Sequence, residues 1–174
     1  MARKYGAAFE VESCKEKFFE IYLNKYAVAG SGIGCAGAKE LVERCRELGL
    51  KTAVASSADL VKVHANLKAA EIPLGLFDAV VSADAFANLK PAPDIFLAAA
   101  REVGAEPNSC VVIEDAVAGV KAARSASMRV IGVTTTLKEE DMVAAGPDRI
   151  FSDISKITVE DICGLKLKGV QVSS

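Results

Sequence analysis

The chain has 174 residues, of which 51% are hydrophobic and 25% charged, a globular composition that excludes a wholly disordered chain. Its 21 Lys and Arg residues nearly balance its 23 Asp and Glu residues, and the net charge of −2 excludes a broad attraction to nucleic acid or to an anionic membrane. No apolar run approaches the roughly 20 residues that span a bilayer, so we expect a small-molecule or protein ligand, with no nucleic-acid and no membrane partner.

The first predicted element is a helix over residues 14–26. Ser13 and Glu16 form a capping-box pattern, and the FFEIYL segment that follows has apolar residues at helical spacing. A glycine-rich segment, AVAGSGIGCAG, then separates this helix from a second one over 38–48, which ends before Gly49.

From residue 50 onward, predicted strands alternate with predicted helices of about ten residues. The strands cover 50–57, 78–84, 110–115, 128–134 and 149–153, and the helices between them cover 60–70, 95–103, 117–126 and 137–145. This alternation predicts an α/β fold with a Rossmann-like parallel sheet and right-handed crossovers. Ligands bind such sheets beyond the carboxyl ends of the strands.

Polar residues stand at or after three of these strand ends. Ser56 and Ser57 end a buried strand just before a helix, where hydroxyl and N–H groups can hold a phosphate. Lys90 follows the next strand, held by the two prolines of KPAPD, and can neutralise negative charge. Glu114 and Asp115 follow a third strand as an acid pair suited to Mg²⁺.

Each of these features also has a simple structural explanation. Serines often begin turns, a loop lysine is often solvated, and Asp115 can cap the helix that follows it. Together, after three successive strands of one parallel sheet, they favour a phosphate ester bound with Mg²⁺.

The segments VASSAD, LKPAPDIF and VVIEDAVAGV resemble the second, third and fourth motifs of haloacid dehalogenase-like (HAD) hydrolases, in the branch of β-phosphoglucomutase and sugar-phosphate phosphatases. The resemblance covers roughly residues 34–160. It implies that Ser56 and the Ser57 backbone bind phosphate, that Lys90 is a catalytic residue neutralising the phosphate and the nucleophile, and that Glu114 and Asp115 hold Mg²⁺. The implied substrate is a small phosphorylated metabolite.

Three further segments, FFEIYLNKYA, SGIG and ANLKAA, are similar to the HAD domain of plant chloroplast suppressor-of-quenching proteins. That resemblance alone implies a chloroplast location. Independently, the five cysteines are odd in number and form no CxxC pair, which favours thiols in a reducing, intracellular compartment.

The nucleophile of the resembled family is an aspartate in a DxDx(T/V) motif at the end of the first strand, and this sequence has no Asp before Asp59. The resemblance therefore implies a HAD core that lacks its first, central strand, with residues 1–33 as the remnant of a helical cap, 34–165 as the core and 166–174 as a tail. We expect the halves of the sheet to close up, to recruit a partner chain or to fold poorly. We also expect a truncated protein, weakly active or inactive, with weak or absent Mg²⁺ binding.

Two alternatives from other functional classes remain open. The first is a non-catalytic regulatory or binding module, or a subunit completed by another chain. The second is an NAD-binding oxidoreductase, because residues Gly32–Gly37 match GxGxxG and Asp59 follows about 20 residues later. That interpretation requires a strand before the glycines.

Overall fold

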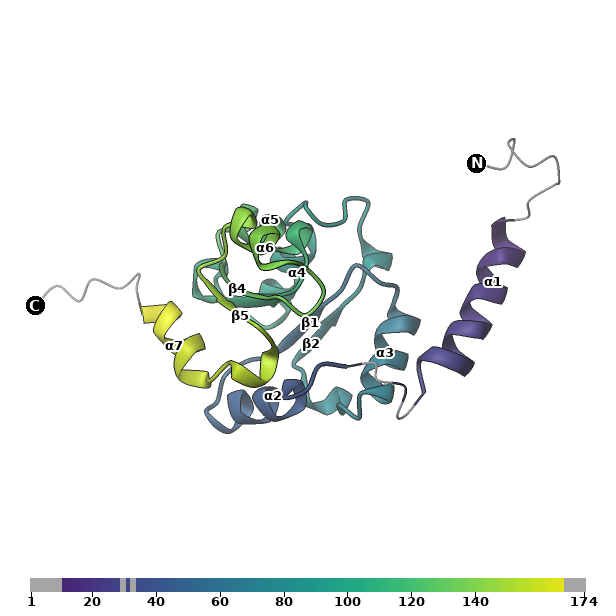
Figure 1. Ribbon diagram of the computed structural model, residues 1–174, viewed down its shortest axis with the longest axis horizontal. Coiled ribbons are helices and arrows are strands. Elements are labelled where there is room, and N and C mark those ends of the chain that lie inside the picture. The colour runs from purple at the N-terminus through teal and green to yellow at the C-terminus, as the bar shows by residue number, and fades with distance from the viewer. Residues whose placement is uncertain (1–10, 29–30, 32–33, 168–174) are drawn as a thin grey trace, which may run out of the picture.

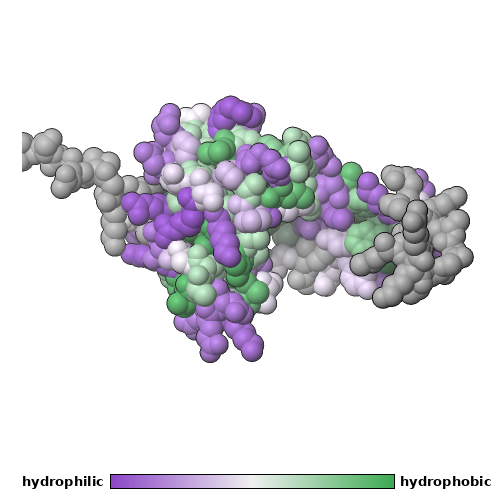
Figure 2. Space-filling view, turned by 90° about the horizontal axis from the view of Figure 1, so that it is seen from above, coloured by the Kyte–Doolittle hydropathy of each residue, from purple (hydrophilic) through white to green (hydrophobic). Residues whose placement is uncertain are grey.

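The computed structural model describes residues 11–28, 31 and 34–167 of the chain. Its strands lie in the middle of the core with helices on both sides, while the first helix extends away from the core beside α3 (Figure 1). The face in Figure 2 interleaves hydrophilic and hydrophobic residues. None of the described helices is long and apolar enough to cross a membrane.

The helices cover most of the regions that the sequence predicts. They are α1 (Val11–Ile21), which continues as the π-helical turn η2 (Tyr22–Tyr26), α2 (Ala38–Glu47), α3 (Leu60–Ala69), α4 (Asp94–Glu102), α5 (Val117–Ser125), α6 (Glu139–Ala145) and α7 (Val159–Leu167). The sequence did not predict α7, which runs into the segment interpreted as a tail; residues 168–174 of that tail lie outside the described part of the chain.

All the strand pairings among the described residues are parallel, which confirms the predicted α/β class. The strands are β1 (Ala53–Ala55), β2 (Ala79–Val81), β3 (Val111–Glu114), β4 (Arg129–Val133) and β5 (Arg149–Phe151). They form a two-stranded sheet, β1-β2, and a three-stranded sheet, β3-β4-β5. No pairing joins β1 to β3 among the described residues, as expected for a core that lacks its central strand.

The hydrophobic core lies on both faces of the longer sheet. Val130 of β4 belongs to one cluster, which α4, α5 and α6 cover, whereas Ile131 and Val133 belong to the other, which α2 and α7 cover. This division follows from the alternation of side chains along a strand. Full burial of the β4 residues therefore fixes its register and, through it, the carboxyl end of β3.

The N-terminal helical segment packs against α3. The Tyr22 hydroxyl donates a hydrogen bond to Asn66 Oδ1 at 2.7 Å, and Lys62 Nζ lies 4.9 Å from the ring centres of both Phe18 and Phe19. The assignment of residues 1–33 to a cap remnant and of 34–165 to the core stays a prediction, and residues 1–10 lie outside the described part.

The glycine-rich segment follows helices rather than a strand. Residues 11–26 form α1 and η2, so the strand that a dinucleotide-binding site requires is missing from the described residues there. Gly32 and Ile33 lie outside the described residues. Gly37 has a packing role, because a Cβ at this position would lie 2.6 Å from the Cα of Ser155.

Candidate active site

Polar groups from β1, β3 and the loop after β2 meet at one cavity of about 550 Å³. Four of the five predicted site residues line it, namely Ser56, Ser57, Lys90 and Glu114. The cavity opens beyond the carboxyl ends of β1 and β3, the edge where ligands bind in parallel sheets.

Lys90 is held in place between the two sheets. Its Nζ donates hydrogen bonds to Glu114 Oε2 at 2.8 Å and to the Ala55 carbonyl at 3.1 Å, and it lies 4.5 Å from the centre of the Phe96 ring. The Lys90 and Glu114 side chains are only 12% and 10% exposed. Charge-assisted hydrogen bonds in such a site fix the ammonium group more firmly than they would in water.

Glu114 uses both carboxylate oxygens. Its Oε1 accepts hydrogen bonds from the N–H groups of Asp115 and Ala116, at 3.2 and 3.1 Å, while Oε2 accepts from Lys90. Gly119 makes room for this arrangement, because a Cβ there would lie 2.0 Å from Glu114 Cδ. The sequence offered one signal for Gly119: an interior helical glycine costs about 1 kcal/mol relative to alanine and therefore often has a packing reason.

Asp115 is the predicted site residue that does not line the cavity. Its Oδ2 accepts a hydrogen bond from the Thr136 hydroxyl at 3.2 Å, which ties the end of β3 to the loop after β4. Asp115 does not cap α5: the capping position is Ala116, with no side-chain hydrogen bond. Thr136 belongs to no motif, so nothing in the sequence assigns it to the site.

The serine pair lies in the turn between β1 and α3. Ser56 Oγ accepts a hydrogen bond from the Ala58 N–H at 3.1 Å, and the Ser57 residue is exposed. Asp59 begins α3 by accepting a hydrogen bond from the Lys62 N–H at 2.9 Å. Ser56, Ser57 and Ala58, in the turn that leads into α3, thus form one wall of the cavity.

Glu114 and Asp115 match part of a Mg²⁺ site. Mg²⁺ in proteins is often held by one or two carboxylates, with water and substrate phosphate completing its oxygen ligands. The described residues hold no group of three or more His, Cys, Asp or Glu side chains arranged for a metal ion. Because Lys90 and two backbone N–H groups already engage Glu114, Asp115 is the carboxylate better placed to hold a cation.

Cys35 lies close enough to Asp115 to be affected by its charge. Partial burial first, and then the negative charge of Asp115, raise the pKa of the Cys35 thiol. A raised pKa keeps the thiol protonated at neutral pH, so Cys35 is not an activated nucleophile.

A sequence model of the family described as haloacid dehalogenase-like hydrolase matches residues 3–127 of the chain. Protein SUPPRESSOR OF QUENCHING 1, chloroplastic, of Arabidopsis thaliana is 61% identical over 154 residues, which are 88% of this chain and 15% of that protein. Hexitol phosphatase B of Escherichia coli K12 is 32% identical over 128 residues, which are 74% of this chain and 57% of that protein. The chain thus spans a small part of the plant relative and little more than half of the bacterial one.

The fold is also similar to those of solved structures. The crystal structure of CbbY from Rhodobacter sphaeroides in complex with phosphate has a TM-score of 0.78 and 25% identity, over 90% of this chain and 70% of that one. β-Phosphoglucomutase from Clostridium difficile, at 24% identity and a TM-score of 0.76, shares the fold over 91% of this chain and 68% of that one. With the family match covering most of its residues, the chain belongs to the haloacid dehalogenase-like hydrolase family.

Proposed function

We propose that this HAD domain binds the phosphoryl group of a small phosphorylated metabolite and belongs to a Mg²⁺-dependent phosphatase or phosphomutase. The observation that carries the proposal is the position of Lys90, whose ammonium group is fixed beside the serine turn and the end of β3. Two relatives support the same substrate class: hexitol phosphatase B by its name, and CbbY by its crystal structure in complex with phosphate.

In this proposal each side chain has a defined task. The Ser56 hydroxyl and the Ser57 N–H donate hydrogen bonds to phosphate oxygens, and Lys90 neutralises charge on the phosphoryl group and on the attacking carboxylate. Glu114 orients Lys90 through the 2.8 Å hydrogen bond. Asp115, with Glu114, would hold Mg²⁺, which when bound supplies further charge neutralisation.

The attacking carboxylate is the missing component. The sequence has no Asp before Asp59, and that residue caps α3. Glu114, which lines the cavity, already accepts hydrogen bonds with both carboxylate oxygens. We therefore propose that the chain as given is weakly active or inactive, that it binds Mg²⁺ weakly, and that a partner chain carrying the carboxylate would restore turnover.

A second candidate is a non-catalytic phosphate-binding module, either regulatory or a subunit of a larger assembly. The interruption of the sheet between β1 and β3 favours this candidate. An attacking carboxylate would have to come from that place, and no described strand lies there to carry one. A chloroplast location is proposed from the plant relative alone.

Titration with inorganic phosphate, followed by ³¹P NMR, tests the shared part of both candidates. We expect saturable binding that is lost in Lys90→Ala and kept in Lys121→Ala, a matched change at an exposed lysine of α5. Hydrolysis of p-nitrophenyl phosphate with Mg²⁺, measured in the presence of a partner chain that carries the carboxylate, then separates the two candidates, because only the first expects turnover. Phosphate binding that survives Lys90→Ala would contradict the proposed site.

A further inference from the structure

The loop that follows β2 carries Lys90 and also holds the serine turn, residues 56–59 between β1 and α3, in place. The Ala83 N–H of this loop donates a hydrogen bond to the Ala58 carbonyl at 3.0 Å. At the end of β2, the Val81 carbonyl accepts a hydrogen bond from the Ser56 N–H at 2.9 Å. Backbone groups at the end of β2 therefore fix the serine turn at two points.

Asp84 adds a side-chain contact at the end of the same turn. Its Oδ2 accepts hydrogen bonds from the Leu60 N–H at 2.7 Å and from the Ser82 hydroxyl at 3.0 Å. Leu60 is the first residue of α3, and Ser82 is buried directly after β2, so this one oxygen joins the helix to the sheet. The two hydrogen bonds, the one from Leu60 foremost, hold the pKa of Asp84 below its usual value, which keeps the carboxylate ionised at neutral pH.

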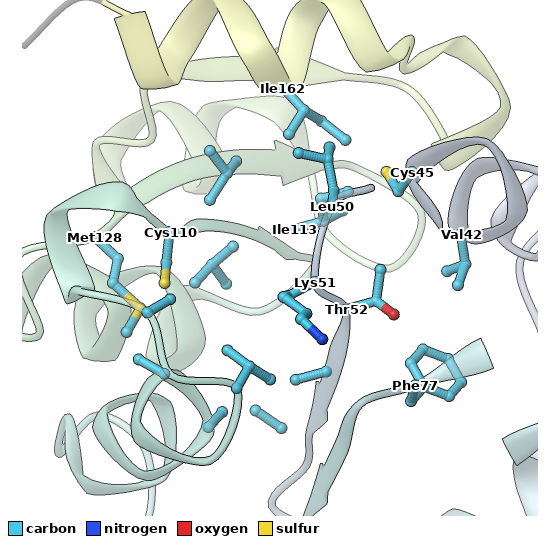
Figure 3. A pocket seen from close by; sticks show the side chains of 18 of the residues that line it. Val42, Cys45, Leu50, Lys51, Thr52, Phe77, Cys110, Ile113, Met128 and Ile162 are labelled. Atoms are coloured by element: carbon cyan, nitrogen blue, oxygen red, sulfur yellow. The ribbon is translucent and has the colours of Figure 1, made fainter. Parts of the chain in front are cut away.

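The other edge of β1 has no comparable support. Ala53 and Ala55 border a second cavity, of about 540 Å³, which separates β1 from β3. Figure 3 shows this cavity, with Thr52 on the side of β1 and Cys110 on the side of β3. No strand pairs with this edge of β1 among the described residues. The position of the serine turn therefore depends on β2 and on the loop that follows it.

These contacts leave two donors of the turn available to a ligand. The Ser56 Oγ accepts a hydrogen bond from the Ala58 N–H at 3.1 Å, so its own proton can be donated to another group. No hydrogen bond within the described residues engages the Ser57 N–H. Both serines line the cavity that contains Lys90, whereas Asp84 does not line it. Asp84 can therefore act on a bound phosphate only through the serine turn.

The two carboxylates at the start of α3 have different tasks. Asp59 precedes the helix and accepts a hydrogen bond from the Lys62 N–H at 2.9 Å, so it caps the helix locally. Asp84 comes from the loop after β2 and bonds to both Leu60 and Ser82, so it connects the helix to the sheet. Because each carboxylate bonds to one N–H of the same helical turn, Asp59 provides a matched control for Asp84.

We propose that Asp84 is a positioning residue of the phosphoryl-binding site. Its carboxylate holds the start of α3 against the end of β2 and thereby keeps the Ser56 hydroxyl and the Ser57 N–H in place to donate to a phosphate. The inference rests on the proposed function, because it concerns the alignment of donors to the same phosphate. It adds to that function a group that acts on the phosphate without touching it.

Two substitutions of Asp84 test this role by titration with inorganic phosphate, followed by ³¹P NMR. Asp84→Ala removes the acceptor, and we expect about tenfold weaker phosphate binding, together with faster amide hydrogen exchange at Leu60. Asp84→Asn keeps a carbonyl oxygen. Because a single oxygen of Asp84 accepts both hydrogen bonds, this variant should bind phosphate within about twofold of the unmodified chain.

Asp59→Ala is the control for a general effect on α3. It removes the other side-chain hydrogen bond from the first turn of the helix but leaves the contact between Leu60 and Asp84 in place. We expect its phosphate affinity to change by less than about twofold, although the loss of a cap lowers its stability in urea as it does in Asp84→Ala. The difference in affinity between the two alanine variants then measures the position of the serine turn rather than the stability of the helix.

The outcomes separate this inference from the proposed function. Equal phosphate affinity of Asp84→Ala and the unmodified chain would overturn the positioning role and leave the proposed function intact. An Asp59→Ala variant as weak as Asp84→Ala would do the same, because the loss of any cap from α3 would then be sufficient. If Asp84→Asn were as weak as Asp84→Ala, the hydrogen bonds would not be the cause and the inference would fail. An unmodified chain that binds no phosphate would overturn the proposed function and this inference together.

Discussion

The ammonium group of Lys90 and the carboxylate of Glu114, 2.8 Å apart, form an ion pair between the two separate sheets. Lys90 also bonds to the Ala55 carbonyl, so one side chain connects the end of β1 to the end of β3 where no strand lies between them among the described residues. The same contacts hold the cation at the phosphoryl-binding cavity. Stability and the proposed chemistry therefore depend on the same pair.

Breaking this pair from one side should destabilise the protein. Glu114→Ala leaves the nearly buried Lys90 ammonium without its carboxylate, and we expect the free energy of unfolding to fall by about 3 kcal/mol, as for other buried pairs that lose one partner. Urea unfolding measures the change. The double variant Lys90→Met with Glu114→Leu removes both charges and should recover most of the loss. If Glu114→Ala were as stable as the unmodified chain, the charges of Lys90 and Glu114 would be solvated rather than buried.

Gly119 should not tolerate a methyl group. Gly119→Ala would place a Cβ 2.0 Å from Glu114 Cδ, so the carboxylate must move and Lys90 must lose its orientation. We expect destabilisation of about 1–3 kcal/mol from overpacking, despite the better helix propensity of alanine, together with weaker phosphate binding.

Gly164 provides the control for this substitution. It lies in α7, and a Cβ added there would have no neighbour within 4 Å, so Gly164→Ala should stabilise the protein by about 0.5–1 kcal/mol. Thermal unfolding and phosphate titration of both variants make the comparison. The explanation fails if the two alanine variants change stability in the same direction.

Asp78 should make stability depend on pH. Hydrogen bonds from the Thr52 N–H, foremost, and from Lys51 hold the pKa of Asp78 below its usual value, and Arg46 adds to the effect. A depressed pKa in the folded state means that this contribution is present above the unfolded-state pKa of about 3.9 and is lost as the pH falls through the folded value.

Asp78→Asn tests this dependence. The variant should be less stable than the unmodified chain at pH 7, with the difference shrinking as the pH falls below about 4. Glu102→Gln, at an exposed position of α4, should show no such change. The melting temperatures of the three proteins are measured at pH 7 and at a pH below about 4. A difference in melting temperature between Asp78→Asn and the unmodified chain that is the same at both pH values would contradict the prediction.

The site was predictable where its chemistry lies at strand ends. Ser56, Lys90 and Glu114 each follow an apolar strand in the sequence, and parallel pairing brings such ends to one edge. Thr136 could not be found in this way, because it belongs to no motif and contributes only hydrogen bonds to Asp115. Its role depends on the distance between two loops, which no local pattern records.

The extent of the elements was less predictable than their order. The strand expected over 50–57 is reduced to the three residues of β1, which among the described residues has a partner strand, β2, on one edge only. The weakly amphipathic α7 carries Gly164, and its pattern does not indicate a helix that continues into the expected tail. It is stabilised by packing: Ile162 is buried in the cluster that also contains Leu41 of α2.

Asp115 should be the main carboxylate of a weak cation site, because its Oδ2 accepts a hydrogen bond from Thr136, whereas Lys90 pairs with Glu114. With few protein ligands, the site should bind a divalent cation with a dissociation constant on the order of millimolar. Mn²⁺ in place of Mg²⁺ makes this visible as paramagnetic broadening of the amide signals of residues 114–116.

Asp115→Asn should abolish that broadening because it removes a carboxylate charge from the cation site, whereas Asp153→Asn, in the loop after β5 where Asp153 bonds to Ser155, should not. Broadening that is equal in the Asp115→Asn variant and in the unmodified chain would place the cation elsewhere and would leave Asp115 as a structural partner of Thr136.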